Sequence, residues 1–179
     1  MTEAQPSAQG RRVLVARVTG EVGRRIQAWR EQYDPEQAQR LPPHTTLCYW
    51  PPAVDPDLLY AQIRHAFDEP VTVRLGSVHE FDNTDHTFYL EVQETAALDR
   101  MRERLFDGTH VKLAGRTTWT WHVTCVRYGN ERDLRLLHEV ADQLTLNMPW
   151  QVDTVSYLEL RGDRYETIAE WTVTPAAST

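Results

Sequence analysis

HTTL at residues 44–47 and HVTC at residues 122–125 are the two stretches that decide how this chain folds. Each is a His-x-Thr set in an apolar run that is typical of a β-strand. Side chains at i and i+2 point to the same face of a strand, so each stretch presents one imidazole beside one hydroxyl. Two such strands facing one another would bring together two histidines for proton transfer and two hydroxyls for holding an anion.

Length and composition predict an ordinary globular protein. The chain has 179 residues, of which 41% are hydrophobic and 25% are charged, and we expect one domain over residues 1–179. Residues 1–10 and 175–179 are expected to be loose tails. No apolar run approaches the roughly 20 residues that span a bilayer, and the polar N-terminus lacks the apolar centre of a secretory signal. We therefore expect a cytoplasmic protein.

The formal net charge of −7 limits the class of partner. Contacts to phosphates dominate affinity for long nucleic acids, and an acidic surface opposes them. Small nucleotides or RNA ends therefore fit better than extended duplexes. A local basic pocket stays compatible with the net charge, because the net charge says nothing about its distribution.

Hydrophobic periodicity and turn residues predict an order of elements that occurs twice. The order strand, helix, motif strand, helix, strand covers residues 13–79 and then 87–160, with a last strand at 166–173. Strands are expected at 13–18, 44–50, 71–79, 86–93, 118–128, 152–160 and 166–173, and helices at 21–32, 55–67, 95–105 and 134–144. The polar stretch 33–40 is expected to connect elements. The repetition predicts two related halves about a pseudo-twofold axis, with His44 opposite His122 across a groove.

Two histidines and two hydroxyls suit phosphoester chemistry without a metal. Opening a 2′,3′-cyclic phosphate requires one group that takes a proton from water and another that protonates the departing ribose oxygen. Histidine, with a pKa near 6.5, can supply both roles around neutral pH. The hydroxyls of Thr46 and Thr124 can donate hydrogen bonds to phosphate oxygens where charge builds.

The residues around both motifs resemble the 2H phosphoesterase superfamily, and most closely its 2′-5′ RNA ligase-like cyclic phosphodiesterase branch. The resemblance is carried by Pro43-His44-Thr45-Thr46-Leu47 and by the run 121–127, which ends at Arg127. The run departs from the family at Trp121, where proline is common, and at Cys125, where leucine is common. The order of elements resembles the family over residues 13–173.

The resemblance implies a bilobal α+β fold, with antiparallel sheets flanking a central cleft and helices outside. It also implies metal-independent hydrolysis of 2′,3′-cyclic or 2′,5′-linked phosphodiesters. His44 and His122 would be the catalytic acid/base pair, while Thr46 and Thr124 would bind the substrate phosphate. Arg127 resembles a family arginine that binds phosphate or RNA. Strand parity places Arg127 opposite His122, so only a bulge or the end of the strand would turn it inward.

Other residues give weaker signals. By parity Cys48 shares a face with His44, and Cys125 points away from His122, so we expect two reduced thiols rather than a disulfide. The sequence has no zinc-binding signature, so we predict no metal site. It also has no glycine-rich phosphate loop, and we predict no cofactor and no use of ATP.

Three functions remain open at this level. The first is an enzyme, a cyclic nucleotide or RNA phosphodiesterase whose reverse reaction would join RNA ends through a 2′-5′ linkage. The alternative is a non-catalytic module that binds a nucleotide or RNA end in the same cleft. The third is a metallohydrolase that uses several of the seven histidines. The expected partner is a nucleotide or RNA terminus, and neither a membrane nor a protein partner is implied.

Overall fold

The computed structural model describes residues 10–49, 55–67, 69–82, 86–106, 119–127 and 146–173, together with single residues between 135 and 144. The elements follow in the order β1 (Arg12–Arg17), α1 (Gly20–Tyr33), α2 (Pro35–Arg40), β2 (His44–Tyr49), α3 (Pro56–Ala66), β3 (Val71–Glu80), β4 (Phe88–Gln93), α4 (Ala96–Phe106), β5 (His122–Val126), β6 (Met148–Val152), β7 (Thr154–Arg161) and β8 (Arg164–Thr172). Of the helix predicted at 134–144, residues 135, 138, 139, 141, 143 and 144 are described and all are helical, and the others lie outside the described residues.

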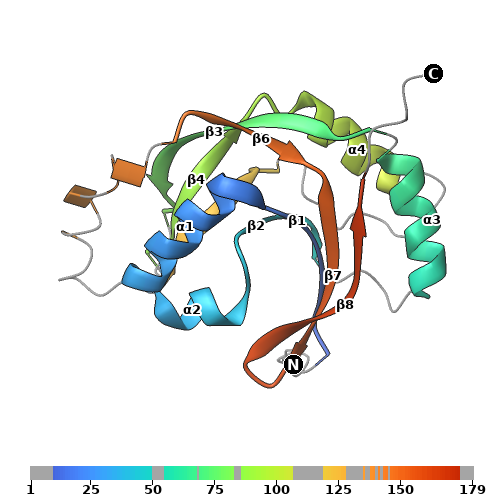
Figure 1. Cartoon of the computed structure of the whole chain (residues 1–179), viewed down its shortest axis with the longest axis horizontal. Coiled ribbons are helices and arrows are strands. Elements are labelled where there is room, and N and C mark those ends of the chain that lie inside the picture. The colour runs from blue at the N-terminus through green and yellow to red at the C-terminus, as the bar shows by residue number, and fades with distance from the viewer. Residues whose placement is uncertain are drawn as a thin grey trace, which may run out of the picture.

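The strands form two four-stranded antiparallel sheets (Figure 1). Sheet A has the order β2-β1-β7-β8, and sheet B has the order β5-β4-β3-β6. Each motif strand is the edge strand of its sheet and pairs with the strand that precedes it in the sequence. The predicted α+β fold with two antiparallel sheets related by repetition is therefore confirmed.

The two sheets do not correspond to the two halves of the sequence. The strand predicted at 71–79 was expected to close the first half, but β3 lies in sheet B between β4 and β6. Consecutive strands joined by a short turn pair as a hairpin, and this preference draws β3 to β4. Sheet A is completed instead by β7, which pairs with β1 from Arg12 opposite Glu159 to Ala16 opposite Val155.

Two elements differ from what the sequence predicts. The stretch 33–40 contains α2, a short helix whose N-cap Asp34 accepts a hydrogen bond from the Gln37 amide at 3.2 Å. A polar helix of this length has no apolar periodicity, so only the Asp34-Pro35 start signal indicates it. The strand expected at 152–160 is β7, but the strand β6 that precedes it at Met148–Val152 was not expected.

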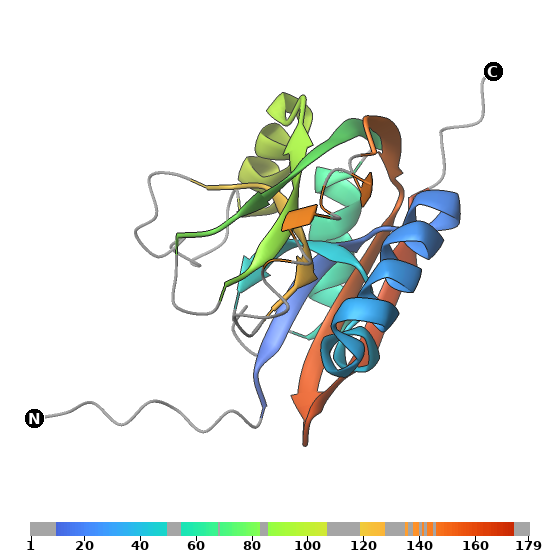
Figure 2. The ribbon, with the colours of Figure 1, turned by 90° about the vertical axis from the view of Figure 1, so that its left-hand side faces the viewer.

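The main core contains apolar residues from one side of each of the helices α1, α3 and α4. Ile26 of α1 is fully buried, as are the stripes Leu59 and Ile63 of α3 and Leu98, Met101 and Leu105 of α4. Figures 1 and 2 show α1 and α2 on one side of sheet A and α3 on the other. None of the described helices is long and apolar enough to cross a membrane.

Candidate active site

The first motif lies on β2 and is followed at once by a β-bulge. His44 pairs with Arg17 of β1 and Thr46 pairs with Val15, but the register then shifts so that Cys48 pairs with Leu14. Residue 47 is therefore an extra residue in β2. A bulge of this kind re-aims the side chains that follow it.

The second motif on β5 has the same irregularity at the equivalent place. His122 pairs with Glu91 of β4 and Thr124 pairs with Tyr89, and the register shifts immediately after Thr124. Val126 then pairs with Phe88, so residue 125 is the extra residue. In both motifs, therefore, one bulged residue follows the threonine directly. The two motif strands, β2 and β5, also contact one another.

The bulges correct two expectations that came from strict alternation. One extra residue reverses the face of everything that follows it. Arg127, just beyond the end of β5, therefore returns to the side of His122 instead of pointing away from it. Cys48 does the opposite, since it leaves the side of His44 and packs in the main core with 6% of its surface exposed. Burial accordingly raises the pKa of the Cys48 thiol to about 11.

Both motif histidines are anchored in the same way. Nδ1 of His44 lies 2.7 Å from the carbonyl oxygen of Pro42, and Nδ1 of His122 lies 2.8 Å from the carbonyl oxygen of Thr120. A carbonyl oxygen can only accept, so Nδ1 of each ring must carry the proton and donate it. The neutral tautomer therefore leaves Nε2 with its lone pair, which is the atom that can take or return a proton.

The surroundings lower the pKa of both imidazoles. Burial lowers the pKa of His44 to about 4, against the opposing effect of the hydrogen bond to Pro42. Positive charge on Arg30, His122 and Arg127 lowers it further. Burial is also the main cause that lowers the pKa of His122, with a smaller contribution from the charge of Arg127. His44, His122 and Arg127 therefore lie near enough for their charges to act on one another.

Arg127 is held by a buried carboxylate that the sequence did not indicate. The backbone amide of Arg127 donates to Oδ2 of Asp34 at 2.8 Å, while Oδ1 of Asp34 caps α2. Asp34 is only 8% exposed. Burial raises its pKa, whereas the hydrogen bonds from Arg127 and Gln37 lower it. The corner between α1 and α2 is thereby tied to the end of β5.

Aromatic rings surround His122. The ring of Phe81 stacks on Tyr89 at 4.0 Å between centroids, and it meets His122 edge-on at 4.9 Å. The Tyr89 ring also meets His122 edge-on, at 5.5 Å. Neither Phe81 nor Tyr89 belongs to a motif that the sequence shows. For Tyr89 a signal existed, because it alternates with the buried residues Phe88 and Leu90 and so had to face the other side of β4.

One departure from the family pattern, Trp121, has a structural role. Trp121, next to the second histidine, is 4% exposed, and its indole Nε1 donates to Asp99 of α4 at 2.7 Å. Arg102 of the same helix donates through Nε to the carbonyl oxygen of Leu47, the bulged residue of β2, at 3.1 Å. The helix α4 therefore supports both motif strands. Within the described part of the chain, no group of three metal-ligating side chains occurs.

Comparison with known proteins agrees with this geometry. The sequence model of the 2′-5′ RNA ligase superfamily matches residues 19–164, which include both motifs. The chain belongs to this superfamily. The resemblance to 2H phosphoesterases is thus confirmed at the level of the family. No curated protein matches the sequence closely enough to serve as a relative.

Solved structures show the same fold at low sequence identity. TT0787 of Thermus thermophilus has a TM-score of 0.61 and 15% identity, over 92% of this chain and 98% of that one. Escherichia coli LigT complexed with 3′-AMP has a TM-score of 0.56 and 18% identity, over 94% of this chain and 99% of the other. A protein described as a phosphoesterase has a TM-score of 0.55 and 15% identity, over 92% of this chain and 99% of that one. This superfamily member therefore has a LigT-like fold.

Proposed function

We propose that this protein is a metal-independent phosphodiesterase that acts on 2′,3′-cyclic or 2′,5′-linked phosphodiesters of nucleotides or RNA ends. The observation that carries the proposal is the matched anchoring of the two motif histidines. Each donates Nδ1–H to a carbonyl oxygen two residues earlier and keeps Nε2 available, on strands that contact one another. Such a pair can supply one base and one acid for the same reaction.

In this proposal the two histidines divide the proton transfers. His44, whose pKa is about 4, is neutral and takes the proton of the attacking water, while His122 in its protonated form protonates the departing ribose oxygen. Each positioned acid or base typically contributes about 10²–10⁴-fold to the rate. The hydroxyls of Thr46 and Thr124 and the guanidinium of Arg127 would hold the phosphate oxygens as negative charge builds there.

Ligands of the similar structures support the substrate class. LigT of Escherichia coli has been solved with 3′-AMP and, in another structure with a TM-score of 0.51, with phosphate. A 3′-phosphorylated nucleoside has the same parts as an opened 2′,3′-cyclic nucleotide. The aromatic rings of Phe81 and Tyr89 beside His122 offer apolar surface for a ribose or base.

The proposal is tested by incubating the protein with 2′,3′-cyclic nucleotides and with a 2′,5′-linked dinucleotide, with and without EDTA. We expect turnover that persists under chelation and falls by about 10²-fold or more in His44→Ala and in His122→Ala. His65→Ala is the matched control, because His65 is an exposed histidine of α3 and should leave the rate unchanged.

Two results would overturn the proposal. Tight nucleotide binding without turnover would indicate a binding module that uses the same residues. Activity that EDTA abolishes would indicate a metal-dependent hydrolase.

A further inference from the structure

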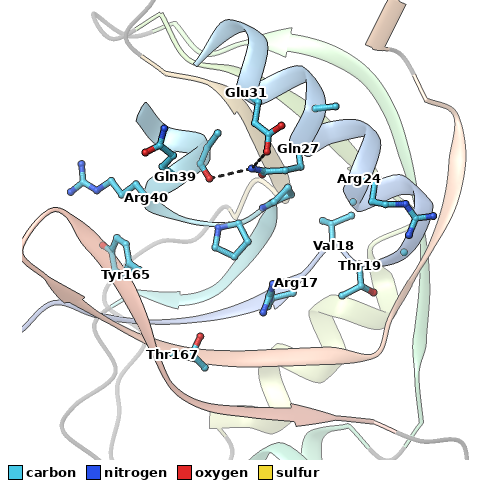
Figure 3. A pocket seen from close by; sticks show the side chains of 16 residues that line it. Arg17, Val18, Thr19, Arg24, Gln27, Glu31, Gln39, Arg40, Tyr165 and Thr167 are labelled. Carbon is cyan, nitrogen blue, oxygen red and sulfur yellow. Dashed lines mark hydrogen bonds between the residues drawn. The ribbon is translucent and has the colours of Figure 1, made fainter. Parts of the chain in front are cut away.

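A polar groove of about 780 Å³ lies between α1, α2 and the start of β8 (Figure 3). Its volume is within the range of roughly 300–1,000 Å³ that is typical of small-molecule sites. Arg17, Arg24 and Arg40 contribute side chains to its wall, as do Tyr165 and Thr167 of β8. We call this site the arginine groove.

The arginine groove carries positive charge in an acidic chain. Three arginines and a single carboxylate, that of Glu31, line it, whereas the whole chain has a net charge of −7. Arg17 is paired with Glu170 at 2.7 Å. Arg24 and Arg40 lie at opposite ends of the groove in Figure 3. Among the described residues, neither has a carboxylate at ion-pair distance, so both can meet an anion.

Gln27 ties α1 to α2 in the wall of the groove. Its Nε2 is engaged, since it donates to Glu31 at 3.0 Å and to the carbonyl oxygen of Ala38 at 3.3 Å. Its Oε1 is buried and accepts no hydrogen bond from the described residues. The oxygen has almost no accessible surface, so the part that Gln27 plays in the groove is to hold its wall in place.

The groove adjoins the first motif histidine. Pro42 and Pro43 line it and directly precede His44 in the sequence, and the Pro42 carbonyl is the group that anchors the His44 ring. Arg17 is paired with His44 across the β1–β2 ladder. Side chains that are directly paired in an antiparallel ladder share a face. The groove therefore lies beside His44, on the face of sheet A that His44 shares with Arg17.

We propose that the arginine groove binds the sugar–phosphate backbone of a single RNA strand whose terminal phosphodiester reacts at His44 and His122. The inference rests on the proposed function and names its substrate class, an oligoribonucleotide end rather than a free mononucleotide. Arg24 and Arg40 hold backbone phosphates. The rest of the acidic surface disfavours long duplexes.

The kinetic test compares two substrates, a 2′,3′-cyclic mononucleotide and a short oligoribonucleotide that ends in a 2′,3′-cyclic phosphate. In the double variant Arg24→Glu/Arg40→Glu, we expect KM for the oligonucleotide to rise about tenfold or more, with the mononucleotide unaffected. The matched control, Arg25→Glu/Arg64→Glu, makes the same change of net charge at exposed arginines outside the groove. Equal losses on both substrates, or equal losses in the control, would overturn the proposal.

A binding measurement separates failure of the groove from failure of the proposed function. The probe is a fluorescent oligoribonucleotide ending in a 3′-phosphate, followed by anisotropy at several salt concentrations. We expect weaker binding in the groove variant, and a salt dependence whose slope falls by about one for each arginine lost. If the wild-type protein turns over neither substrate, the proposed function fails. An unchanged affinity and slope in the groove variant would reject the groove.

Discussion

At the scale of single residues, the environment of the two imidazoles determines the pH at which they can act. Both rings donate Nδ1–H to carbonyl oxygens, and burial lowers the pKa of both. A pair that acts as base and acid needs one neutral and one protonated ring. That combination is most abundant between the two pKa values, so the lower of them, about 4 for His44, bounds the acid side.

We therefore predict a bell-shaped profile of kcat/KM with its optimum below pH 6.5. Activity falls as the pH drops through about 4, because His44 then becomes protonated and can no longer act as the base. It falls on the alkaline side as His122 loses its proton, at a pH below the usual pKa of histidine because burial lowers that value. Initial rates between pH 3.5 and 8 check this, and a profile that is flat across that range would contradict it.

Arg127 gives a second prediction at this scale. Its positive charge lowers the pKa of both histidines, so Arg127→Met should raise both values and move the whole profile of kcat/KM to higher pH. Loss of a charged contact to phosphate is worth about 1.5–3 kcal/mol, so KM should rise about tenfold or more. The measurement is a pH series of initial rates for both proteins. An unshifted optimum would mean that the charge does not act on the pair.

The local sequence pattern predicts the four motif residues, but it does not predict the orientation of Arg127. His44, Thr46, His122 and Thr124 follow from a local pattern, because the alternation of a strand places i and i+2 on one face. The orientation of Arg127 required a bulge after the motif. A bulge depends on how a strand pairs with its neighbour, so it is not visible in the strand's own residues.

At the scale of elements, the corner between α1 and α2 positions the end of β5. Asp34 both caps α2 and accepts the Arg127 amide, whereas Asp55 caps α3 by accepting from Asp57 at 2.8 Å. Both aspartates precede a proline. An apolar stripe follows Asp55, so hydrophobic periodicity predicts α3, whereas α2 is short and polar and has no such stripe after Asp34.

The two aspartates form a matched pair for a third prediction. Loss of a helix cap costs about 1 kcal/mol, so Asp34→Ala and Asp55→Ala should share that loss of stability. Only Asp34→Ala also releases the Arg127 amide, so it alone should lower kcat/KM and shift the pH optimum upwards, in the direction expected for Arg127→Met. Asp34→Asn, which has one carboxamide oxygen for two donors, should be intermediate. Thermal unfolding and pH profiles measure both effects, and equal activity in the two alanine variants would remove the role of Asp34.

At the scale of the whole molecule, the sequence halves exchange strands to build the two sheets. The repeated order of elements predicted two halves, and the structure has two sheets with a motif strand at the edge of each. Which strands complete each sheet did not follow from the repeat, since β3 pairs with its neighbour β4 while β7 crosses back to β1. Each half therefore lacks the strand that would complete its own sheet.

This exchange predicts that neither half folds alone. A fragment 1–84 retains β1 and β2 but lacks β7 and β8, and a fragment 85–179 retains β4 and β5 but lacks β3. An isolated pair of strands is marginally stable in water, so each fragment should show no cooperative thermal unfolding. Mixed in equal amounts, the fragments should recover near-ultraviolet circular dichroism and the turnover of 2′,3′-cyclic nucleotides, because each supplies one motif histidine and the strands that the other lacks. Cooperative unfolding of either fragment by itself would show that the halves are independent units, and strand exchange would then not be what holds them together.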